Sequence, residues 1–477
     1  MMVTATNPHT NTPDSHPQRT WYNTLTSPVD GSSLGAFRLL FGLLMVWEVI
    51  RYFQFDRINR YYIEYRFFFT YEFVPFVTPL PSSLMYAHFV IMGLAALALA
   101  VGLFYRASAF VFLITYSYVF LLDKTQYNNH YYLIILFAFL LIIVDGNRWL
   151  ALDNVLNAPS DKTEQQDGTV PYWHVFIIQI QILIVYVYAG IAKINVDWLA
   201  GDPMRAWLAR RAHYPVVGPF FTTELAPYFF SYGGLIFDLS IGFLLLWRRT
   251  RLFALIPLIF FHLMNKWLFS IGIFPYMMLA TTIIFADPDW LRRLLGGPRN
   301  KATDDEISTN SRRYSAGQNQ LAMAFVAVYL TLQILIPLRH WLYPGDVAWT
   351  EEGHRFSWRM KLRGKSGQLA MTVTDPATNQ IWAVDLQRDL ADRQISKMST
   401  RPDMIFQYVQ SIKTRSQEIG IENPVIHIHA ETSLNSRPYQ PFIDPTINLA
   451  GVEYPLFSHA SWILPSPTEE SISTEAP

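Results

Sequence analysis

The sequence predicts a polytopic α-helical membrane bundle followed by a small α+β extramembrane domain. Hydrophobic residues make up 51% of the 477 residues, aromatic residues 16% and charged residues only 16%, so the chain is more apolar and more aromatic than a typical soluble enzyme. Long apolar segments recur through roughly the first 340 residues. From about residue 344 they give way to short alternating runs, which indicate strands.

A membrane span needs about twenty apolar residues, and on that criterion the chain has about nine spans, some of them short. They cover approximately residues 34–53, 84–104, 107–122, 131–144, 172–193, 229–247, 252–264, 267–286 and 321–339. Residues 55–80 are aromatic but also carry arginines, which favours an interfacial helix over a span. We therefore assign residues 31–340 to a transmembrane bundle.

The ends of the chain and the loop charges suggest how the bundle lies in the membrane. Residues 1–30 and 466–477 are polar, and we expect both segments to be disordered. The amino-terminal segment lacks the pattern of a cleavable signal peptide, so the first apolar helix is expected to act as an uncleaved anchor. With nine spans, most basic loops share one face with the amino terminus. The positive-inside rule makes that face cytoplasmic and everything after Tyr343 extracytoplasmic.

The part after the bundle, residues 341–465, is expected to form an extracytoplasmic α+β domain. The runs RFSWRMKLRG, LAMTVTDP, QIWAVDL and PVIHIHAET predict strands, and helical spacing predicts a helix from Pro402 to Gly420. Alternation in the last run places His427 and His429 on one face of its strand.

Lys193 is the most informative residue of the bundle because it ends an otherwise apolar span. An ionisable side chain at bilayer depth is costly, and it indicates a pathway, a counter-ion or a catalytic site. Burial penalises the ammonium form, and a neutral amine can act as a general base. The alternative is a lysine at the interface whose head reaches water.

A carboxylate near Lys193 would decide between these interpretations. Tyr186, Gly190, Lys193 and Asp197 have the spacing of one helix face. A pair between Lys193 and Asp197 would hold the lysine protonated and work against a free base. The alternative is a structural ion pair at the helix end.

A polar cluster precedes the apolar helix that begins near residue 131. Asn128 and Asn129 are good helix caps, so capping alone would explain them. His130 can donate, accept or relay a proton near neutral pH, although a hydrogen-bonded interfacial histidine is equally common.

Two further polar positions lie in later spans. His262, Asn265 and Lys266 interrupt apolar runs, which resembles a broken span around a polar cavity; a tight connection between two helices is the alternative. Asp238 also lies within a span, where a pair with an arginine such as Arg38 would be the simplest explanation.

Several classes of function are disfavoured by composition. The formal net charge is +0, so there is no electrostatic case for nucleic acid. The chain has no cysteine, which removes disulfides, thiolate ligands and cysteine nucleophiles. The histidines are scattered without ligand spacing, and we predict no metal site.

Five ordered motifs resemble the vitamin K-dependent γ-glutamyl carboxylase family. They are YVFLLDKTQYNNHYYLIILFAF, DGNRWLALDNVLN, QILIVYVYAGIAKINVDWLAGDPM, FDLSIGFLLLW and HLMNKWLFSIGIFPYMMLA. RFSWRMKL, PVIHIHAETSLNSRPYQPFIDPTINL and SHASWILP resemble that family's extracytoplasmic region. The resemblance covers roughly residues 34–465.

The resemblance implies a membrane enzyme that oxygenates reduced vitamin K to its epoxide with O2. The reaction drives removal of a γ-proton from protein-bound glutamate, and CO2 then adds. The catalytic base implied by the AGxxKxxxDW motif is Lys193, and His130 with Asn129 is implied to act at the glutamate. Weaker candidates for the quinone pocket are Asn128, Tyr186, Asp197, Trp198, Asp238, His262 and Asn265.

This sequence departs from the animal members in three ways. It ends soon after the outer domain, it lacks the cysteines of their disulfide, and Ala192 stands where they have a second lysine. A short version without cysteine suggests a bacterial relative whose peptide substrate either differs or is absent. Two other functions stay open: a quinone epoxidase or quinol oxidoreductase without carboxylation, and a non-enzymatic transport or lipid-binding module in which Lys193 only pairs with Asp197.

Overall fold

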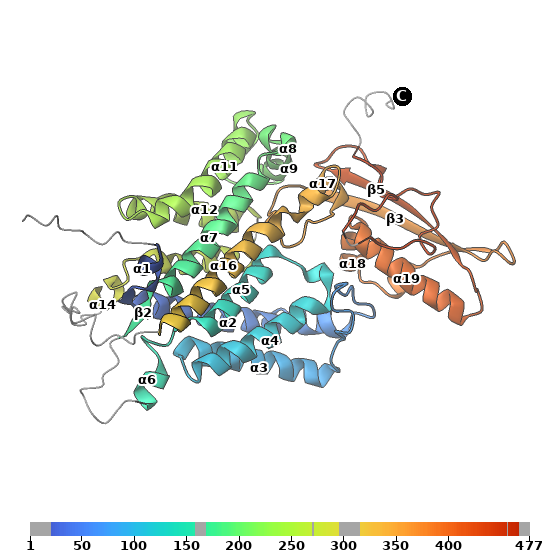
Figure 1. Cartoon of the computed structure of the whole chain (residues 1–477). Helices are drawn as coiled ribbons and strands as arrows, with labels where there is room; N and C mark the ends of the chain where they lie inside the picture. Colours follow the sequence, from blue (N-terminus) through green and yellow to red (C-terminus); the bar gives the residue numbers. More distant parts are fainter. Residues whose placement is uncertain (1–20, 158–167, 270, 295–314, 456, 467–477) are drawn as a thin grey trace, which may run out of the picture.

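The computed structural model describes residues 21–157, 168–269, 271–294, 315–455 and 457–466. A helical bundle is followed by a smaller domain built on a sheet, which lies at one end of the bundle (Figure 1). The predicted fold class is confirmed. The predicted disordered tail, residues 466–477, lies outside the described residues except for its first residue.

The predicted apolar segments are largely helical, but residues 267–286 are divided between the end of one helix, at Phe269, and the next helix, which begins at Phe274. Seven helices of the described part are long and apolar enough to cross a membrane, and two are shorter, so nine spans is an approximate count. The long helices are α2 (Ser32–Gln54), α3 (Ser82–Val101), α4 (Tyr105–Leu122), α7 (Tyr172–Ala192), α11 (Leu225–Leu246), α12 (Arg251–Phe269) and α16 (Ala316–Leu338). The shorter ones are α5 (Asn129–Ile143) and α13 (Phe274–Thr281), which a 3₁₀ turn extends through Thr282–Phe285.

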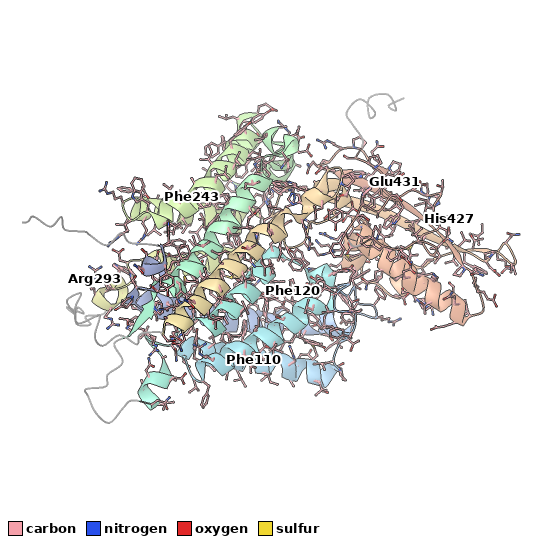
Figure 2. All side chains as sticks on the ribbon, in the orientation of Figure 1. Phe110, Phe120, Phe243, Arg293, His427 and Glu431 are labelled. Atoms are coloured by element: carbon pink, nitrogen blue, oxygen red, sulfur yellow. The ribbon has the colours of Figure 1, made fainter. Side chains whose placement is uncertain are left out.

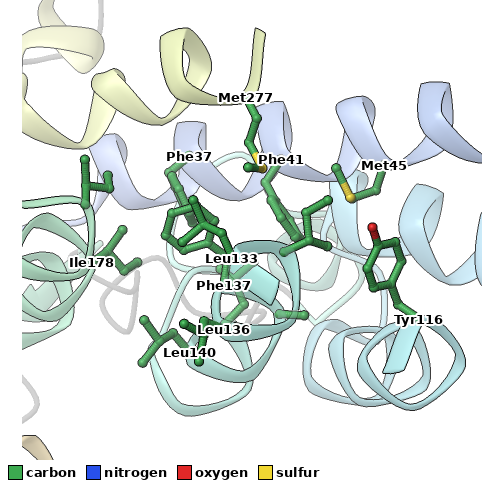
Figure 3. Close-up of a cluster of buried hydrophobic side chains, with 14 of the residues drawn as sticks. Phe37, Phe41, Met45, Tyr116, Leu133, Leu136, Phe137, Leu140, Ile178 and Met277 are labelled. Carbon is green, nitrogen blue, oxygen red and sulfur yellow. The ribbon is translucent and has the colours of Figure 1, made fainter. Parts of the chain in front are cut away.

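The bundle holds together through an apolar interior. Phe137 of α5 meets Phe37 and Phe41 of α2 edge to face, at ring-centroid distances of 5.2 and 6.1 Å (Figure 3). Helices α2 and α3 also approach closely, since a Cβ on Gly42 would lie 2.6 Å from Ala100. Large apolar side chains such as Phe110 and Phe243 point outward and are each 55% exposed (Figure 2), as lipid-facing residues would be.

Short elements connect the long helices. They are α1 (Trp21–Thr26), β1 (Pro28–Asp30), a π-helical turn (Asn59–Ile63), a 3₁₀ turn (Lys124–Gln126), α6 (Leu152–Leu156), β2 (Thr169–Pro171), α8 (Val196–Leu199), α9 (Asp202–Ala209), α10 (Gly218–Phe221), α14 (Trp290–Leu294) and a 3₁₀ turn (Arg339–Leu342). Residues 21–30 were predicted to be disordered but form α1 and β1, because β1 pairs with β2.

Residues 55–80 do not form the predicted interfacial helix beyond the turn at Asn59–Ile63. Their aromatic side chains pack on protein instead. Phe69 is fully buried in the core of the C-terminal domain, and the Phe67 ring meets Tyr408 edge to face at 5.4 Å. Residues 55–80, which are aromatic and also contain arginines, therefore form a loop that packs on the C-terminal domain.

The C-terminal domain is a four-stranded antiparallel sheet with the order β4-β3-β5-β6. Its elements are α17 (Val347–Thr350), β3 (Lys365–Thr374), β4 (Ile381–Ala383), a 3₁₀ turn (Leu386–Arg388), α18 (Asp392–Met398), α19 (Pro402–Glu418), β5 (Val425–Leu434) and β6 (Gln440–Pro441). Helix α19 buries Tyr408 and Val409 in the domain core. As predicted, Ile426 and Ile428 point into this core while His429 is exposed; Figure 2 shows His427 far from the bundle.

Residues 355–364, RFSWRMKLRG, were predicted to be a strand, and that prediction is wrong. We call this stretch the connecting segment. Phe356, Trp358 and Lys361 have positive φ angles of 62°, 56° and 49°, so the backbone cannot remain extended. The alternating apolar side chains pack on the bundle: Trp358 is fully buried in the bundle core and stacks on Tyr132 at 5.0 Å.

Candidate active site

Lys193 lies directly after the last residue of α7, and its side chain turns back into the bundle. The residue is only 6% exposed. Its ammonium or amine nitrogen Nζ lies 2.5 Å from Oδ2 of Asp238 in α11, and 3.2 Å from the carbonyl oxygen of Ala189. Nζ also lies 5.3 Å from the Trp198 ring centroid. The lysine is therefore buried, and its Nζ contacts protein groups.

A glycine allows this pairing. A Cβ on Gly190 would lie 2.6 Å from the Leu239 side chain and 3.1 Å from its backbone nitrogen. Helices α7 and α11 thus approach more closely at this level than any larger residue would permit. The approach brings the end of α7 beside Asp238, a residue in the middle of α11.

Asp197 does not pair with Lys193, and the prediction of one continuous helix face is wrong. Helix α7 ends at Ala192, and Asn195 caps the separate helix α8 by accepting a hydrogen bond from the Trp198 backbone at 2.9 Å. Asp197 turns toward the C-terminal domain. There it accepts hydrogen bonds from Asn435 at 2.6 Å and Arg437 at 2.5 Å.

Asp238 likewise does not pair with Arg38, which donates to the carbonyl oxygen of Leu150 at 2.5 Å. The two residues lie on different helices, and no pattern within one span shows which helices become neighbours.

The Lys193–Asp238 pair faces a cavity of about 240 Å³. Ten of its 24 lining residues are Phe, Tyr or Trp, and Phe237 and Phe261 stack at a centroid distance of 3.8 Å. We call this space the aromatic cavity. Residues that line it are Val185, Tyr186, Lys193, Trp198, Met204, Trp207, Phe229, Phe230, Gly233, Gly234, Phe237, Asp238, Pro257, Phe260, Phe261, His262, Met264, Asn265, Phe269, Ile271, Phe274, His130, Met360 and Lys361.

Most predicted pocket residues meet in this cavity. Tyr186 Oη and His262 Nε2 are hydrogen-bonded at 2.8 Å, and both residues are buried. Asn265 lines the cavity, and Trp198 forms part of its wall with its indole nitrogen donating to the Ser231 carbonyl oxygen at 2.9 Å. Asp197 is not among the lining residues.

The predicted break of the span at His262, Asn265 and Lys266 is wrong in its position. Helix α12 continues through all three residues to Phe269, with Pro257 inside it, and α13 begins only at Phe274. The polar side chains occupy one side of a continuous helix, because His262 and Asn265 face the cavity. Lys266 lies 5.7 Å from the Tyr276 ring and does not line the cavity.

One side of the cavity lies at the outer surface of the bundle. Phe229 and Gly233 of α11 and Pro257 and Phe260 of α12 line it, yet Phe229 is 58% and Phe260 63% exposed. A Cβ on Gly233 would meet no heavy atom within 4 Å. The cavity therefore opens sideways between two membrane-spanning helices.

His130 stands at the opposite wall, in the first turn of α5. Its ring stacks on Phe274 at 3.8 Å, with an angle of 8° between the planes. Asn128 caps the helix by accepting from the His130 backbone nitrogen at 3.2 Å, which is the capping role considered for it. Asn129 accepts from Tyr127 Oη at 2.8 Å and donates to the Arg359 carbonyl oxygen at 3.2 Å, which ties α5 to the connecting segment.

A second cavity, of about 310 Å³, adjoins the first at the junction of bundle and domain. It shares His130, Met360 and Lys361 with the aromatic cavity. We call it the basic chamber. Its remaining lining residues are Tyr127, Asn128, Asn129, Glu351, His354, Arg359, Leu362, Arg363, Lys365, Ser396, Lys397, Thr400 and Arg401.

The basic side chains of this chamber were not predicted. Arg359, Lys361, Arg363 and Lys365 recur at every second position, a regular spacing that could have drawn attention to them. Within the described residues, no group of three or more His, Cys, Asp or Glu side chains could hold a metal ion.

Two family models match the chain. The model of the HTTM domain matches residues 26–290, and the model of the vitamin K-dependent gamma-carboxylase lumenal domain matches residues 318–469. No solved structure matches the chain. The first match contains Lys193, Asp238 and His130, and the second contains the connecting segment and the sheet domain.

Proposed function

This chain belongs to the vitamin K-dependent γ-glutamyl carboxylase family, and on that premise we propose that it oxidises a reduced naphthoquinone with O2 and carboxylates protein-bound glutamate. In balance, hydroquinone and O2 give the epoxide and water, while the glutamyl γ-carbon loses a proton and gains CO2. The observation that carries the proposal is the buried Lys193–Asp238 pair in an aromatic cavity that joins the basic chamber at His130.

The aromatic cavity fits a lipid quinone. Stacked rings such as Phe237 and Phe261 offer flat apolar walls to a naphthoquinone ring, and polar groups are few. The sideways opening at Gly233 and Pro257 gives a prenyl tail a path from the bilayer. Reduced vitamin K, when bound, supplies the reaction with O2 whose released energy drives removal of the γ-proton.

We assign Lys193 as the base that takes the hydroquinone hydroxyl proton. With Asp238 it forms a pair that is neutral overall, either as ammonium and carboxylate or as amine and carboxylic acid. In its amine form Lys193 takes the hydroquinone proton, and the Asp238 carboxyl group, 2.5 Å from Nζ, stabilises the ammonium that results.

His130 and Asn129 are proposed to act where the glutamate enters. His130 belongs to the walls of both cavities, so a side chain reaching from the basic chamber toward Lys193 passes it. Stacking on Phe274 orients its imidazole, and the Asn128 cap holds its backbone at the start of α5. Asn129, held between Tyr127 and Arg359, orients the wall beside it.

The other predicted pocket residues are assigned supporting roles. The hydrogen-bonded Tyr186–His262 pair provides a second donor and acceptor in the cavity besides Lys193. We assign this pair to the second oxygen of the quinone. Asn265 lies on the same helix and offers a further amide. Trp198 supports the lysine, because its ring lies beside Nζ.

The orientation in the membrane is also a proposal. Arg292 pairs with Asp30, and Arg248 and Arg251 pair with Asp287, so these loops gather at the end of the bundle far from the C-terminal domain (Figure 1). By the positive-inside rule that end faces the cytoplasm, which puts the C-terminal domain and the basic chamber outside.

The test uses the full chain in nanodiscs with a chemically reduced naphthoquinone, O2, labelled bicarbonate and a glutamyl peptide. We expect epoxide and labelled peptide from the native chain and neither from Lys193→Ala. Lys266→Ala is the matched control, since this lysine lies outside the cavity, and it should retain activity. Epoxide formed equally well by Lys193→Ala would refute the assigned base, while epoxide without labelled peptide would favour a quinone epoxidase without carboxylation.

A further inference from the structure

A third cavity, of about 210 Å³, also has His130 in its wall. We call it the polar cavity, because ten of its twelve lining residues have a polar or ionisable side chain. A cavity of this size with so many polar groups accommodates water molecules. The lining residues are Glu48, Arg51, Tyr52, Arg57, Tyr61, Gln126, Asn128, His130, Tyr131, Gly272, Ile273 and Arg393.

Glu48 supplies the carboxylate of the polar cavity. It lies within the membrane-spanning helix α2 and is only 2% exposed. Arg51 Nη1 donates to its Oε2 at 2.6 Å, and Arg57 Nη1 lies 3.5 Å from its Oε1. Carboxylates buried in membrane spans commonly belong to ion or proton pathways. The two arginines stay protonated, whereas Glu48 can take up and release a proton.

The polar cavity opens at the end of the bundle that carries the C-terminal domain. Arg393, an exposed residue of α18, forms part of its wall. The guanidinium donates to Tyr61 Oη at 3.2 Å and to Gln126 Oε1 at 3.1 Å. In the orientation proposed above this opening faces the extracytoplasmic side. The cavity thus connects His130 with water outside the membrane.

Coupled carboxylation leaves one proton that must be removed from the bundle. Two protons come from the hydroquinone and one from the glutamyl γ-carbon, and the product water keeps only two of the three. CO2 adds as a carboxylate, which takes none. The remaining proton is the one that Lys193 has accepted, and this residue is only 6% exposed. Without an exit for the proton, the amine would not be restored for the next cycle.

His130 connects Lys193 with such an exit. Both residues line the aromatic cavity, where the reaction also produces water, and His130 lines the other two cavities as well. An imidazole can receive a proton on one ring nitrogen and release it from the other. The basic chamber holds the peptide in the proposed function, and its six lysine and arginine side chains against one carboxylate repel a proton. The polar cavity has three arginines and the Glu48 acceptor, so it is the better exit.

We propose that the polar cavity is the exit for the proton that each carboxylation leaves on Lys193, with Glu48 as its acceptor on the way to the extracytoplasmic side. The inference rests on the proposed function, because the addition of CO2 is what creates the surplus proton. The proton passes from the Lys193 ammonium through product water to His130, and then through water in the polar cavity to Glu48. Release to the outside returns Glu48 to its ionised form, and this residue does not touch the substrates.

The experiment compares epoxide formation with and without CO2 by the full chain in nanodiscs, with the same hydroquinone and glutamyl peptide. Without CO2 the γ-carbon takes its proton back, so no surplus proton arises. In Glu48→Gln the first turnover with CO2 should be retained and later turnovers slowed at least about tenfold, whereas epoxide formation without CO2 should stay within about threefold of the native rate. Formate, a small carboxylate that Arg51 and Arg57 can hold, should restore turnover with CO2.

Asp56→Asn is the matched control, because Asp56 is an exposed carboxylate that pairs with Arg60 at 4.0 Å and does not line the polar cavity. It should react like the native chain. Equal losses in Glu48→Gln with and without CO2 would show a structural role and overturn the inference, and so would native turnover in that variant. A native chain that forms epoxide but never incorporates CO2 would refute the proposed function, and with it the surplus proton.

A measurement on the free protein tests the cavity itself. In hydroxyl-radical labelling, Tyr131 of the cavity wall should react more strongly than Tyr105, which is 2% exposed and donates to the Leu141 carbonyl oxygen. Gly272→Leu should fill the cavity, since a Cβ there meets only the Arg51 guanidinium, at 3.7 Å. This variant should reduce the labelling of Tyr131 and slow turnover only with CO2, and formate should not restore it. Labelling of Tyr131 no stronger than that of Tyr105 in the native chain would overturn the inference.

Discussion

Lys193, at the end of α7, and Asp238, in α11, meet at 2.5 Å in a cavity that ten Phe, Tyr and Trp residues help to line. The lysine alone indicates a candidate base. Its partner Asp238 determines how stable the charged lysine is after it has taken a proton. A buried amine without a partner would be costly to charge, whereas a neutral pair can gain or lose one proton as a unit.

Removing the carboxylate should therefore harm both stability and activity. Asp238→Asn leaves Lys193 buried without a counter-charge, and we expect a loss of about 3 kcal/mol in stability and at least a hundredfold loss of epoxide formation. The double variant Lys193→Met with Asp238→Leu should regain stability but stay inactive. Thermal unfolding and epoxide quantification check the two effects, and an active double variant would contradict the role of the pair.

Asp197 provides the contrasting acidic residue, four positions after the lysine. Since its carboxylate binds Asn435 and Arg437, Asp197→Asn should leave epoxide formation within about threefold of the native rate. The expected effect is on the attachment of the domain: limited proteolysis should cut faster between bundle and domain. Loss of epoxide formation comparable to that of Asp238→Asn would show that Asp197 acts on the lysine after all.

The opening of the aromatic cavity predicts selectivity for the quinone tail. Gly233→Phe adds a ring where a Cβ meets open space, so the fold should be retained while the passage between α11 and α12 narrows. Turnover of a long-tailed hydroquinone should fall at least about tenfold, whereas a tail-less hydroquinone should react nearly as before. Gly317→Phe, also at an open position and outside the cavity, is the control. If turnover of both hydroquinones falls equally, the tail does not enter between α11 and α12.

The basic chamber predicts a pH dependence of peptide binding. Burial lowers the pKa values of Lys365 and Lys397 to about 7 and about 8, so both are charged at pH 6 and both are largely neutral at pH 9. The charges that face Lys397 are those of Arg363, Arg393, Arg401 and Glu351. The glutamyl peptide should bind more tightly at pH 6 than at pH 9, because its carboxylate remains ionised while the lysines lose their protons. In Lys397→Arg the affinity for the peptide should decline less between pH 6 and pH 9. A steeper decline in that variant would show that Lys397 does not cause the pH dependence.

Much of the bundle could be predicted because hydrophobic length is a local property. Most predicted apolar segments correspond to one helix each, and the family motifs singled out Lys193 and His130 from the sequence alone. The partner of Lys193 could not be found this way. Asp197 is closer to Lys193 along the chain, but α7 ends at Ala192 and Asp197 then points away from the lysine. The contact with Asp238 depends instead on α7 and α11 meeting at Gly190.

The errors in the remaining elements share one physical cause. The connecting segment alternates apolar and basic residues like a strand, but Phe356 and Trp358 pack on the bundle and the basic side chains face the chamber. Residues 55–80 look interfacial by composition, yet Phe69 belongs to the core of the domain. In both cases a local pattern was interpreted without knowing which surface would cover it.

Bundle and domain exchange buried aromatic residues, since Trp358 completes the interior of the bundle and Phe69, from the loop between α2 and α3, completes that of the domain. This exchange links the biogenesis of the two parts. The domain reaches its final packing only once the first two apolar helices are inserted and their loop is presented to it, and the bundle closes only after the chain has been made past residue 358. Neither part therefore has a complete core without the other.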